Sequence, residues 1–132
     1  MFQFRLDGAS GVPPYLQIVH QVRQSLLLGY LRPGDRLPTV KEVAVDLAIN
    51  PNTVVKAYRQ LEHENLAAGR PGQGTFITGT PADSSPGPEA SQALRRSLRR
   101  WLAEAAAAGL SEEAITALIA AVRRGTDMRE AG

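Results

Sequence analysis

The sequence predicts a mainly α-helical chain with one small β-hairpin. Two helical patterns follow each other closely between residues 40 and 63, and a short hairpin pattern with a glycine-rich turn comes next. After a stretch rich in proline, glycine and serine, two more amphipathic patterns close the chain. Helix, turn, helix and hairpin in this order are typical of a winged helix-turn-helix. We therefore expect this domain over 1–78, a linker over 79–88 and a short C-terminal helical hairpin over 89–132.

The first helix is expected from Pro14 to about Leu28. Proline suits the first helical position, where its missing N–H is not needed. The apolar residues that follow recur at helical spacing and form one face: Tyr15, Ile18, Val19, Val22 and Leu26. A turn at 32–35 then redirects the chain, and residues 36–37 are expected to form a brief strand beside the hairpin.

The helix-turn-helix has a recognisable start to each of its helices. Thr39 and Glu42 fit a capping box, in which each side chain bonds the backbone N–H of the other residue. The apolar face of this helix consists of Val40, Val43, Ala44 and Leu47. After a turn at 48–49, Asn50 is a good N-cap for the second helix, and Pro51 suits its first position.

The outward face of the second helix carries polar and basic side chains. Asn52, Thr53 and Lys56 lie near its start, and Arg59 follows one turn later. In a helix-turn-helix protein this part of the second helix meets base edges in the major groove. Asparagine pairs with adenine, threonine contacts a base or a thymine methyl, and lysine and arginine suit phosphate or guanine. An ordinary solvated face is the alternative, and the surrounding motif favours DNA contact.

The hairpin is expected to form the wing, with strands at 67–70 and 75–78. Between them, Gly72 and Gly74 allow positive φ and let the backbone approach another surface closely. Arg70 and Gln73 are expected to lie against phosphates or in the minor groove. The alternative is an ordinary hairpin turn with one surface arginine.

Several spaced motifs between residues 10 and 78 resemble the GntR family of bacterial transcription regulators. They are the segments 14–19, 29–38 and 50–62, and the ending Gly-Gln-Gly-Thr-Phe-Ile at 72–77. The sequence motif Pro-Asn-Thr-Val at 51–54 and the short C-terminal part resemble the YtrA subfamily. This resemblance implies a homodimeric repressor of the kind often encoded beside membrane-transporter genes.

The resemblance also implies which residues contact DNA. In the family a basic residue near the start of the helix after Leu-Pro does so, and Lys41 holds that place here. By the same resemblance, the DNA contacts at the start of the second helix are Asn50, Asn52, Thr53 and Lys56. The wing glycine of the family corresponds to Gly72. Some relatives carry arginine where this chain has Lys41, Pro51 and Val55, so their base contacts do not transfer to it.

Two further helices are expected after the linker, from about Glu89 to Ala107 and from the cap residue Ser111 onward. The residues expected to support dimerisation are Leu94, Leu98, Trp101, Leu102, Ile115, Leu118, Ile119 and Val122. A helix pair this short has too little apolar area to stand alone, so its faces must bury against another surface. A second copy is favoured, because two helical hairpins make a four-helix arrangement; the winged domain is the alternative. A two-fold dimer predicts an inverted-repeat operator on double-stranded DNA.

Composition narrows the class of protein further. The 132-residue chain has no cysteine and a net charge of +2, which excludes disulfides and thiolate metal sites. The N-terminus does not fit a signal peptide and no apolar run has transmembrane length, so we expect a cytoplasmic protein with no membrane partner. Without a nucleophile–base pair or carboxylate dyad, we expect no enzyme, cofactor or metal site. A protein-binding winged helix that does not bind DNA, and control by an unidentified small-molecule effector, stay open.

Overall fold

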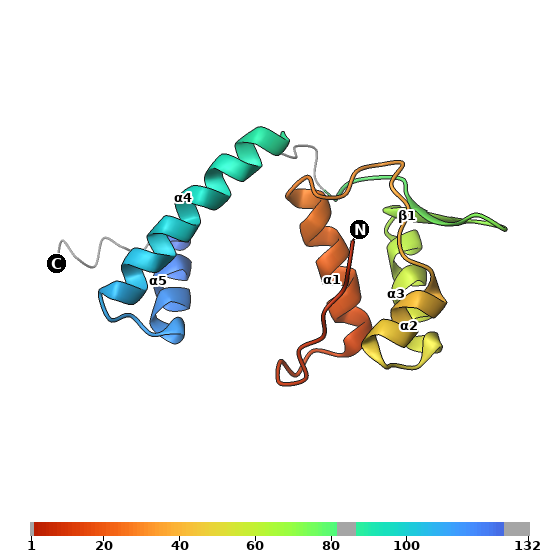
Figure 1. Cartoon of the computed structure of the whole chain (residues 1–132), viewed down its shortest axis with the longest axis horizontal. Helices are drawn as coiled ribbons and strands as arrows, with labels where there is room; N and C mark the ends of the chain where they lie inside the picture. The colour runs from red at the N-terminus through yellow and green to blue at the C-terminus, as the bar shows by residue number, and fades with distance from the viewer. Residues whose placement is uncertain (1, 82–86, 126–132) are drawn as a thin grey trace. The chain divides into compact units, whose positions relative to one another are not determined.

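The computed structural model describes residues 2–81 and 87–125, which form two compact units, Met1–Glu89 and Ala90–Gly132 (Figure 1). The elements of the first unit are α1 (Pro14–Leu27), α2 (Val40–Leu47), α3 (Pro51–His63), β1 (Ala67–Arg70) and β2 (Gly74–Ile77). The second unit is built on α4 (Pro88–Ala107) and α5 (Glu112–Arg124). This order confirms the expected helical fold with one hairpin. Within the described ranges, no helix is both long and apolar enough to cross a bilayer.

The core of the first unit lies between α1 and α3. Both α1 and α2 pack against α3, which also contacts β1 (Figure 1). Ile18 and Leu26 of α1 and Val54 and Leu61 of α3 have no solvent exposure. These are the apolar positions that the helical spacing predicted, so the buried face of each helix is confirmed.

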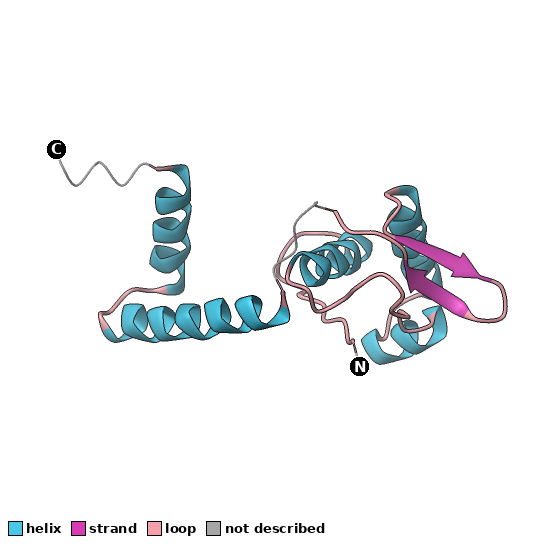
Figure 2. Cartoon of the chain, turned by 90° about the horizontal axis from the view of Figure 1, so that it is seen from above, coloured by secondary structure: helices cyan, strands magenta, loops and turns pink. Residues whose placement is uncertain are grey.

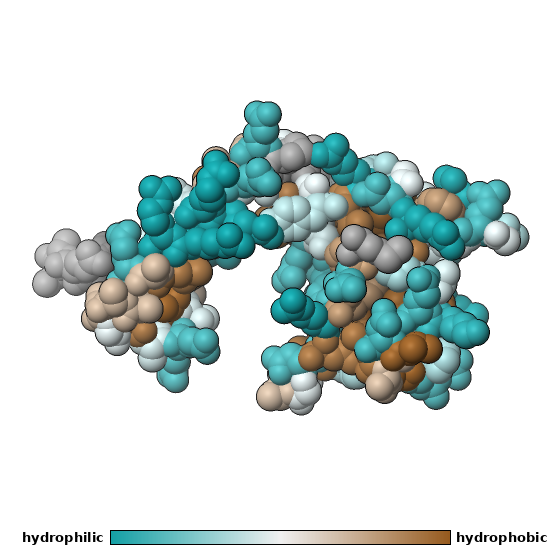
Figure 3. Space-filling model, in the orientation of Figure 1, coloured by the Kyte–Doolittle hydropathy of each residue, from teal (hydrophilic) through white to brown (hydrophobic). Residues whose placement is uncertain are grey.

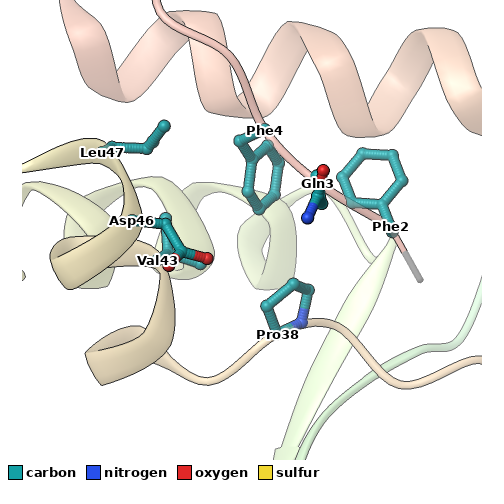
Figure 4. Close-up of a pocket in the computed structure, with 7 residues that line it drawn as sticks. All are labelled: Phe2, Gln3, Phe4, Pro38, Val43, Asp46 and Leu47. Atoms are coloured by element: carbon teal, nitrogen blue, oxygen red, sulfur yellow. The ribbon is translucent and has the colours of Figure 1, made fainter.

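An extended N-terminal segment also belongs to this core, which the sequence pattern did not predict. Phe4 is 8 % exposed, and its ring meets that of Phe2 edge to face with 4.8 Å between centroids. The two rings line a pocket together with Pro38 and with Val43 and Leu47 of α2 (Figure 4). The segment therefore lies against α2 as well as α1.

Two glutamines of α1 hold the backbone of this segment. The Gln21 side-chain oxygen accepts the Arg5 N–H at 2.9 Å, and the Gln17 side-chain oxygen accepts the Asp7 N–H at 2.8 Å. Both glutamines are partly buried on α1. Side-chain amides thus replace the ladder partners that a lone extended segment would otherwise lack.

The wing is an antiparallel hairpin in which Ala67 pairs with Ile77 and Arg70 with Gly74. The Gln73 N–H donates to the Arg70 carbonyl at 2.9 Å and closes a tight turn. The second strand runs over 74–77, one residue earlier than the expected 75–78, because this turn is shorter than the sequence suggested.

Where a brief strand was expected at 36–37, the structure has a single-residue β-bridge beside the wing. Arg36 forms an antiparallel bridge with Phe76. The Leu37 N–H donates to the Thr75 carbonyl at 2.8 Å. The segment that precedes α2 is therefore fixed to the wing.

After the wing, the chain passes a fixed point beside the end of α3. The Thr78 N–H donates to the Leu66 carbonyl at 2.9 Å. At the next residue, Gly79, a Cβ atom would lie 2.6 Å from the Asn65 carbonyl oxygen. A side chain at this position would require the backbone to shift, so glycine is needed for the close approach.

The second unit carries the expected apolar faces but hardly covers them. A short connection joins α4 to α5, so the two expected C-terminal helices are both present (Figure 2). None of the described residues of α5 is buried, and Leu94 of α4 is 66 % exposed. Apolar side chains gather at the surface of this unit (Figure 3). The Ser111 cap is confirmed, since its hydroxyl accepts the Ala114 N–H at 3.1 Å.

Candidate nucleic-acid interface

The start of α3 is positioned by two capped helices. The Thr39 hydroxyl accepts the Glu42 N–H at 3.1 Å, and the Glu42 carboxylate accepts the Thr39 N–H at 2.9 Å. This confirms the capping box, and the bond from the Thr39 N–H lowers the pKa of the Glu42 carboxyl. Ala48 then takes a left-handed φ of 55°. The turn delivers Asn50, whose side-chain oxygen accepts the Asn52 N–H at 2.8 Å.

The two sides of α3 differ in exposure and chemistry. Its buried side consists of Val54, Ala57, Tyr58 and Leu61. The Tyr58 hydroxyl donates to the Pro38 carbonyl at 2.6 Å, and burial raises the pKa of Tyr58. This bond ties α3 to the segment before α2. The orientation of α3 within the unit is therefore set by both packing and a buried hydrogen bond.

The opposite side of α3 is a shallow concave surface, called here the helix face. Its lining residues are Asn52, Val55, Lys56, Arg59, Gln60 and His63. Asn52, Lys56 and Arg59 are exposed and Thr53 is partly exposed. The structure thus brings three of the predicted DNA-binding residues onto one surface, beside the capped start of the helix.

A second, nearly flat surface, called here the wing face, lies over the hairpin. Its lining residues are Arg36, Thr39, Gly69, Arg70, Pro71, Gly72, Gln73, Gly74 and Thr75. Gly72 and Gly74 have φ of 74° and 117°, which side-chain-bearing residues rarely adopt. Arg70, Gly72 and Gln73, all predicted from the sequence, lie exposed on this surface.

Arg36 is a basic residue of the wing face that sequence reasoning missed as a site residue. A Cβ atom at Gly74 would lie 3.0 Å from Arg36 Nε, so the guanidinium lies across the hairpin. The expected strand at 36–37 was the available signal, because pairing with β2 places a side chain of that strand over the wing.

Lys41 and Asn50, the other two predicted contacts, differ from this group. Lys41 is exposed in the first turn of α2 and lines neither of the two faces. Asn50 is also exposed, but its side-chain oxygen serves the N-cap. Its amide nitrogen is the part of the side chain that suits a DNA acceptor.

Two cations of the candidate interface lie over aromatic rings. Lys56 Nζ is 4.0 Å from the centroid of the Tyr15 ring on α1. The Arg70 guanidinium carbon is 4.5 Å from the centroid of the Phe76 ring on β2. Helical spacing correctly predicted that Tyr15 lies on the core side of α1. It did not predict the contact between Tyr15 and Lys56 of α3.

The residues predicted to support dimerisation all belong to α4 and α5 of the second unit. Leu94, Leu98, Leu118 and Val122 are exposed, and Trp101, Leu102, Ile115 and Ile119 are partly exposed. A shallow surface is lined by Leu94, Leu98 and Trp101 together with Ser97, Arg100 and Glu104. The apolar side of α4 is thus flanked by a cation and an anion.

The first unit is similar to known regulatory proteins. Residues 14–77 match a family described as bacterial regulatory proteins, gntR family. The chain is 43 % identical over 74 residues to the HTH-type transcriptional repressor YtrA of Bacillus subtilis (strain 168). That match covers 56 % of this chain and 57 % of the relative. The chain spans a little over half the length of the curated relatives it matches.

Two solved structures are similar over nearly the whole chain. A transcriptional regulator from Oenococcus oeni is 34 % identical, with a TM-score of 0.51 over 92 % of this chain and 98 % of that one. YtrA from Sulfolobus acidocaldarius, a GntR-family transcription factor, is 27 % identical, with a TM-score of 0.53. That match covers 94 % of this chain and 99 % of the other. The similarity therefore extends to the C-terminal helices.

Proposed function

The chain belongs to the gntR family of bacterial regulatory proteins, and on that premise we propose that it is a sequence-specific DNA-binding transcriptional regulator. The observation that carries this proposal is the division of α3 into a fully buried apolar side and an exposed polar and basic side at a capped helix start. Such a start can enter a major groove. It acts, in this proposal, on double-stranded DNA in the cytoplasm.

Each predicted contact has a role that follows from its chemistry. Asn52 and Thr53 would meet base edges, where asparagine reads adenine and threonine reads a base or a thymine methyl. Phosphates would be held by the basic side chains, which are Lys41, Lys56, Arg59 and Arg70. The Asn50 amide and the wing residues Gly72 and Gln73 would contact the backbone or the minor groove.

We also propose that the protein is a homodimeric repressor. The exposed apolar side chains of α4 and α5 support self-association, because a protomer that leaves Leu94 66 % and Val122 55 % exposed has apolar surface still to bury. The Bacillus relative is named a repressor. A two-fold dimer matches an inverted-repeat operator with half-sites about 10 bp, or a multiple of this, apart.

The test is a selection of bound sequences from random double-stranded DNA by the full chain, followed by footprinting of the enriched sequence. We expect an inverted repeat, bound with an affinity that falls steeply as salt rises. Asn52→Ala should weaken binding by about 1–3 kcal/mol per half-site and relax the preference at one base pair. Gln24→Ala, at an exposed position of α1 that lines neither face, is the matched control. Failure to enrich any sequence would overturn the proposal in favour of a protein-binding winged helix.

A further inference from the structure

Two positive charges of the candidate interface are supported by rings from other elements. Lys56 of α3 lies over Tyr15 of α1, with 4.0 Å from Nζ to the ring centroid. Arg70 of β1 lies over Phe76 of β2, with 4.5 Å from the guanidinium carbon to the ring centroid. One pair is on the helix face and the other on the wing face, so both surfaces share this arrangement.

Both rings are held more firmly than the cations they support. Tyr15 is partly buried and packs against the core of the first unit. Phe76 is partly buried and is fixed on both sides, by its pairing with Ala68 and by the bridge to Arg36. Lys56 and Arg70 are exposed. Each ring can therefore act as a rigid support for a side chain that would otherwise move freely in water.

A supported cation has an advantage when it binds a phosphate. Free lysine and arginine side chains populate many rotamers, and ordering them opposes binding. The negative face of an aromatic ring attracts a cation and restricts these rotamers before DNA arrives. The N–H groups that point away from the ring stay able to donate to a phosphate oxygen. The ring thus removes part of the ordering cost without occupying the whole cation.

We propose that Tyr15 and Phe76 are positioning residues for DNA binding, which hold Lys56 and Arg70 in place for phosphate contact. This inference rests on the proposed DNA-binding function and deepens it. Neither ring is required to touch DNA. It follows that each ring should contribute to operator affinity only while its cation is present.

A double-mutant cycle on the full-length protein tests the Tyr15–Lys56 pair. Operator affinity is measured by fluorescence anisotropy at fixed salt for the parent protein, Tyr15→Leu, Lys56→Met and the double variant. We expect Tyr15→Leu to weaken binding roughly two- to tenfold per half-site, as the loss of one pre-ordered side chain implies. In the Lys56→Met background the same change should have no effect. Tyr15→Phe keeps the ring and should bind like the parent.

A shape-matched variant separates the ring's charge distribution from its packing. Tyr15→pentafluorophenylalanine keeps an aromatic ring of similar size but removes the negative potential of its face. We expect it to weaken binding as Tyr15→Leu does while the unfolding temperature stays that of Tyr15→Phe. This readout remains decisive if Tyr15→Leu is too unstable to assay.

Phe76 and Arg70 are tested in the same way, with Phe76→Leu and Arg70→Met. Equal losses in the presence and absence of the cation would overturn the inference, because the ring would then act independently of it. Tighter binding by Tyr15→Leu would also overturn it, since the ring would be competing with the phosphate. Binding by the parent protein is the internal reference: its absence refutes DNA binding itself, whereas additive losses in a protein that does bind refute only the positioning role.

Discussion

Both units of this chain have helices with amphipathic spacing, but the two units differ in how far the apolar faces of these helices are buried. In the first unit most of the apolar face of α1 is covered, and Ile18, Val22 and Leu26 have no solvent exposure. In the second unit α5 has comparable spacing, yet none of its described residues is buried. Amphipathic spacing therefore predicts where a helix forms, whereas burial requires a partner surface.

This difference has an energetic consequence. Fully burying a leucine or valine side chain contributes about 1.5–3 kcal/mol. Leu98 is 50 % exposed and Val122 is 55 % exposed, so much of this stabilisation is still unrealised in the protomer. The first unit should be stable by itself, and the second should depend on association.

The largest expected effect is that of Leu98→Asp, which would place a charge in the proposed dimer surface. Tight binding requires the winged helix-turn-helix domains of both protomers to engage the operator together. We therefore expect operator affinity to fall about 10²- to 10⁴-fold. Sedimentation should show a monomer, and circular dichroism should show the first unit still folded. Trp101→Asp should behave similarly. A variant that sediments as a dimer and still binds the operator would contradict the proposed role of α4.

The same leucine-to-alanine change in each unit gives the next largest effect. Leu61 has no solvent exposure, so Leu61→Ala should cost about 2–5 kcal/mol of unfolding free energy. Leu98→Ala should change the free energy of unfolding of the diluted monomer much less. Denaturant unfolding at protein concentrations below the dimer dissociation constant measures the free energy of unfolding of both variants. Equal costs would show that the second unit buries its leucines within one chain.

A smaller contrast compares the helix caps of the two units. Thr39→Ala removes the hydroxyl of the capping box and should cost about 1 kcal/mol of unfolding free energy. Ser111→Ala removes the corresponding bond at the start of α5, where the helix lacks buried residues. We expect this second change to lower helical content locally without moving the main thermal transition. A shared shift of that transition would show that the two units unfold together.

The smallest effect is a pH dependence that arises in the first unit. The Thr39 N–H bond lowers the pKa of Glu42, and bonds from Gln60 and then Arg23 lower that of Glu64. A lowered pKa in the folded state stabilises the fold above the ordinary glutamate value of 4.5. That contribution is lost as the pH falls through the lowered values. Thermal unfolding between neutral and acid pH should show it, and Glu42→Gln should flatten the curve.

Much of the first unit could be predicted from the sequence, because local rules agree with the tertiary packing there. The capping box at Thr39 and the N-cap at Asn50 need only residues close in the chain. The buried stripes follow from a single helical period. The exposed residues Asn52, Lys56 and Arg59 were found by subtracting that stripe from α3.

The missed features all involve contacts between distant elements. Periodicity describes one helix at a time, so it placed Tyr15 in the core but could not show Lys56 above its ring. Phe4 lies in an extended segment too short to show a period, and side-chain amides of α1 hold that segment. The surface that covers the apolar faces of α4 and α5 could not be predicted for a related reason. Apolar spacing shows that a face must be covered, and does not show by what.

The close approach at Gly79 fixes where the chain departs from the end of α3. The backbone there passes against the Asn65 carbonyl, just beyond the last turn of α3. Tension along the linker would therefore act on the trailing end of that helix. Asn52, near its leading end, is roughly 18 Å away along the axis. The linker therefore meets the end of α3 that lies farther from the proposed base-reading residues.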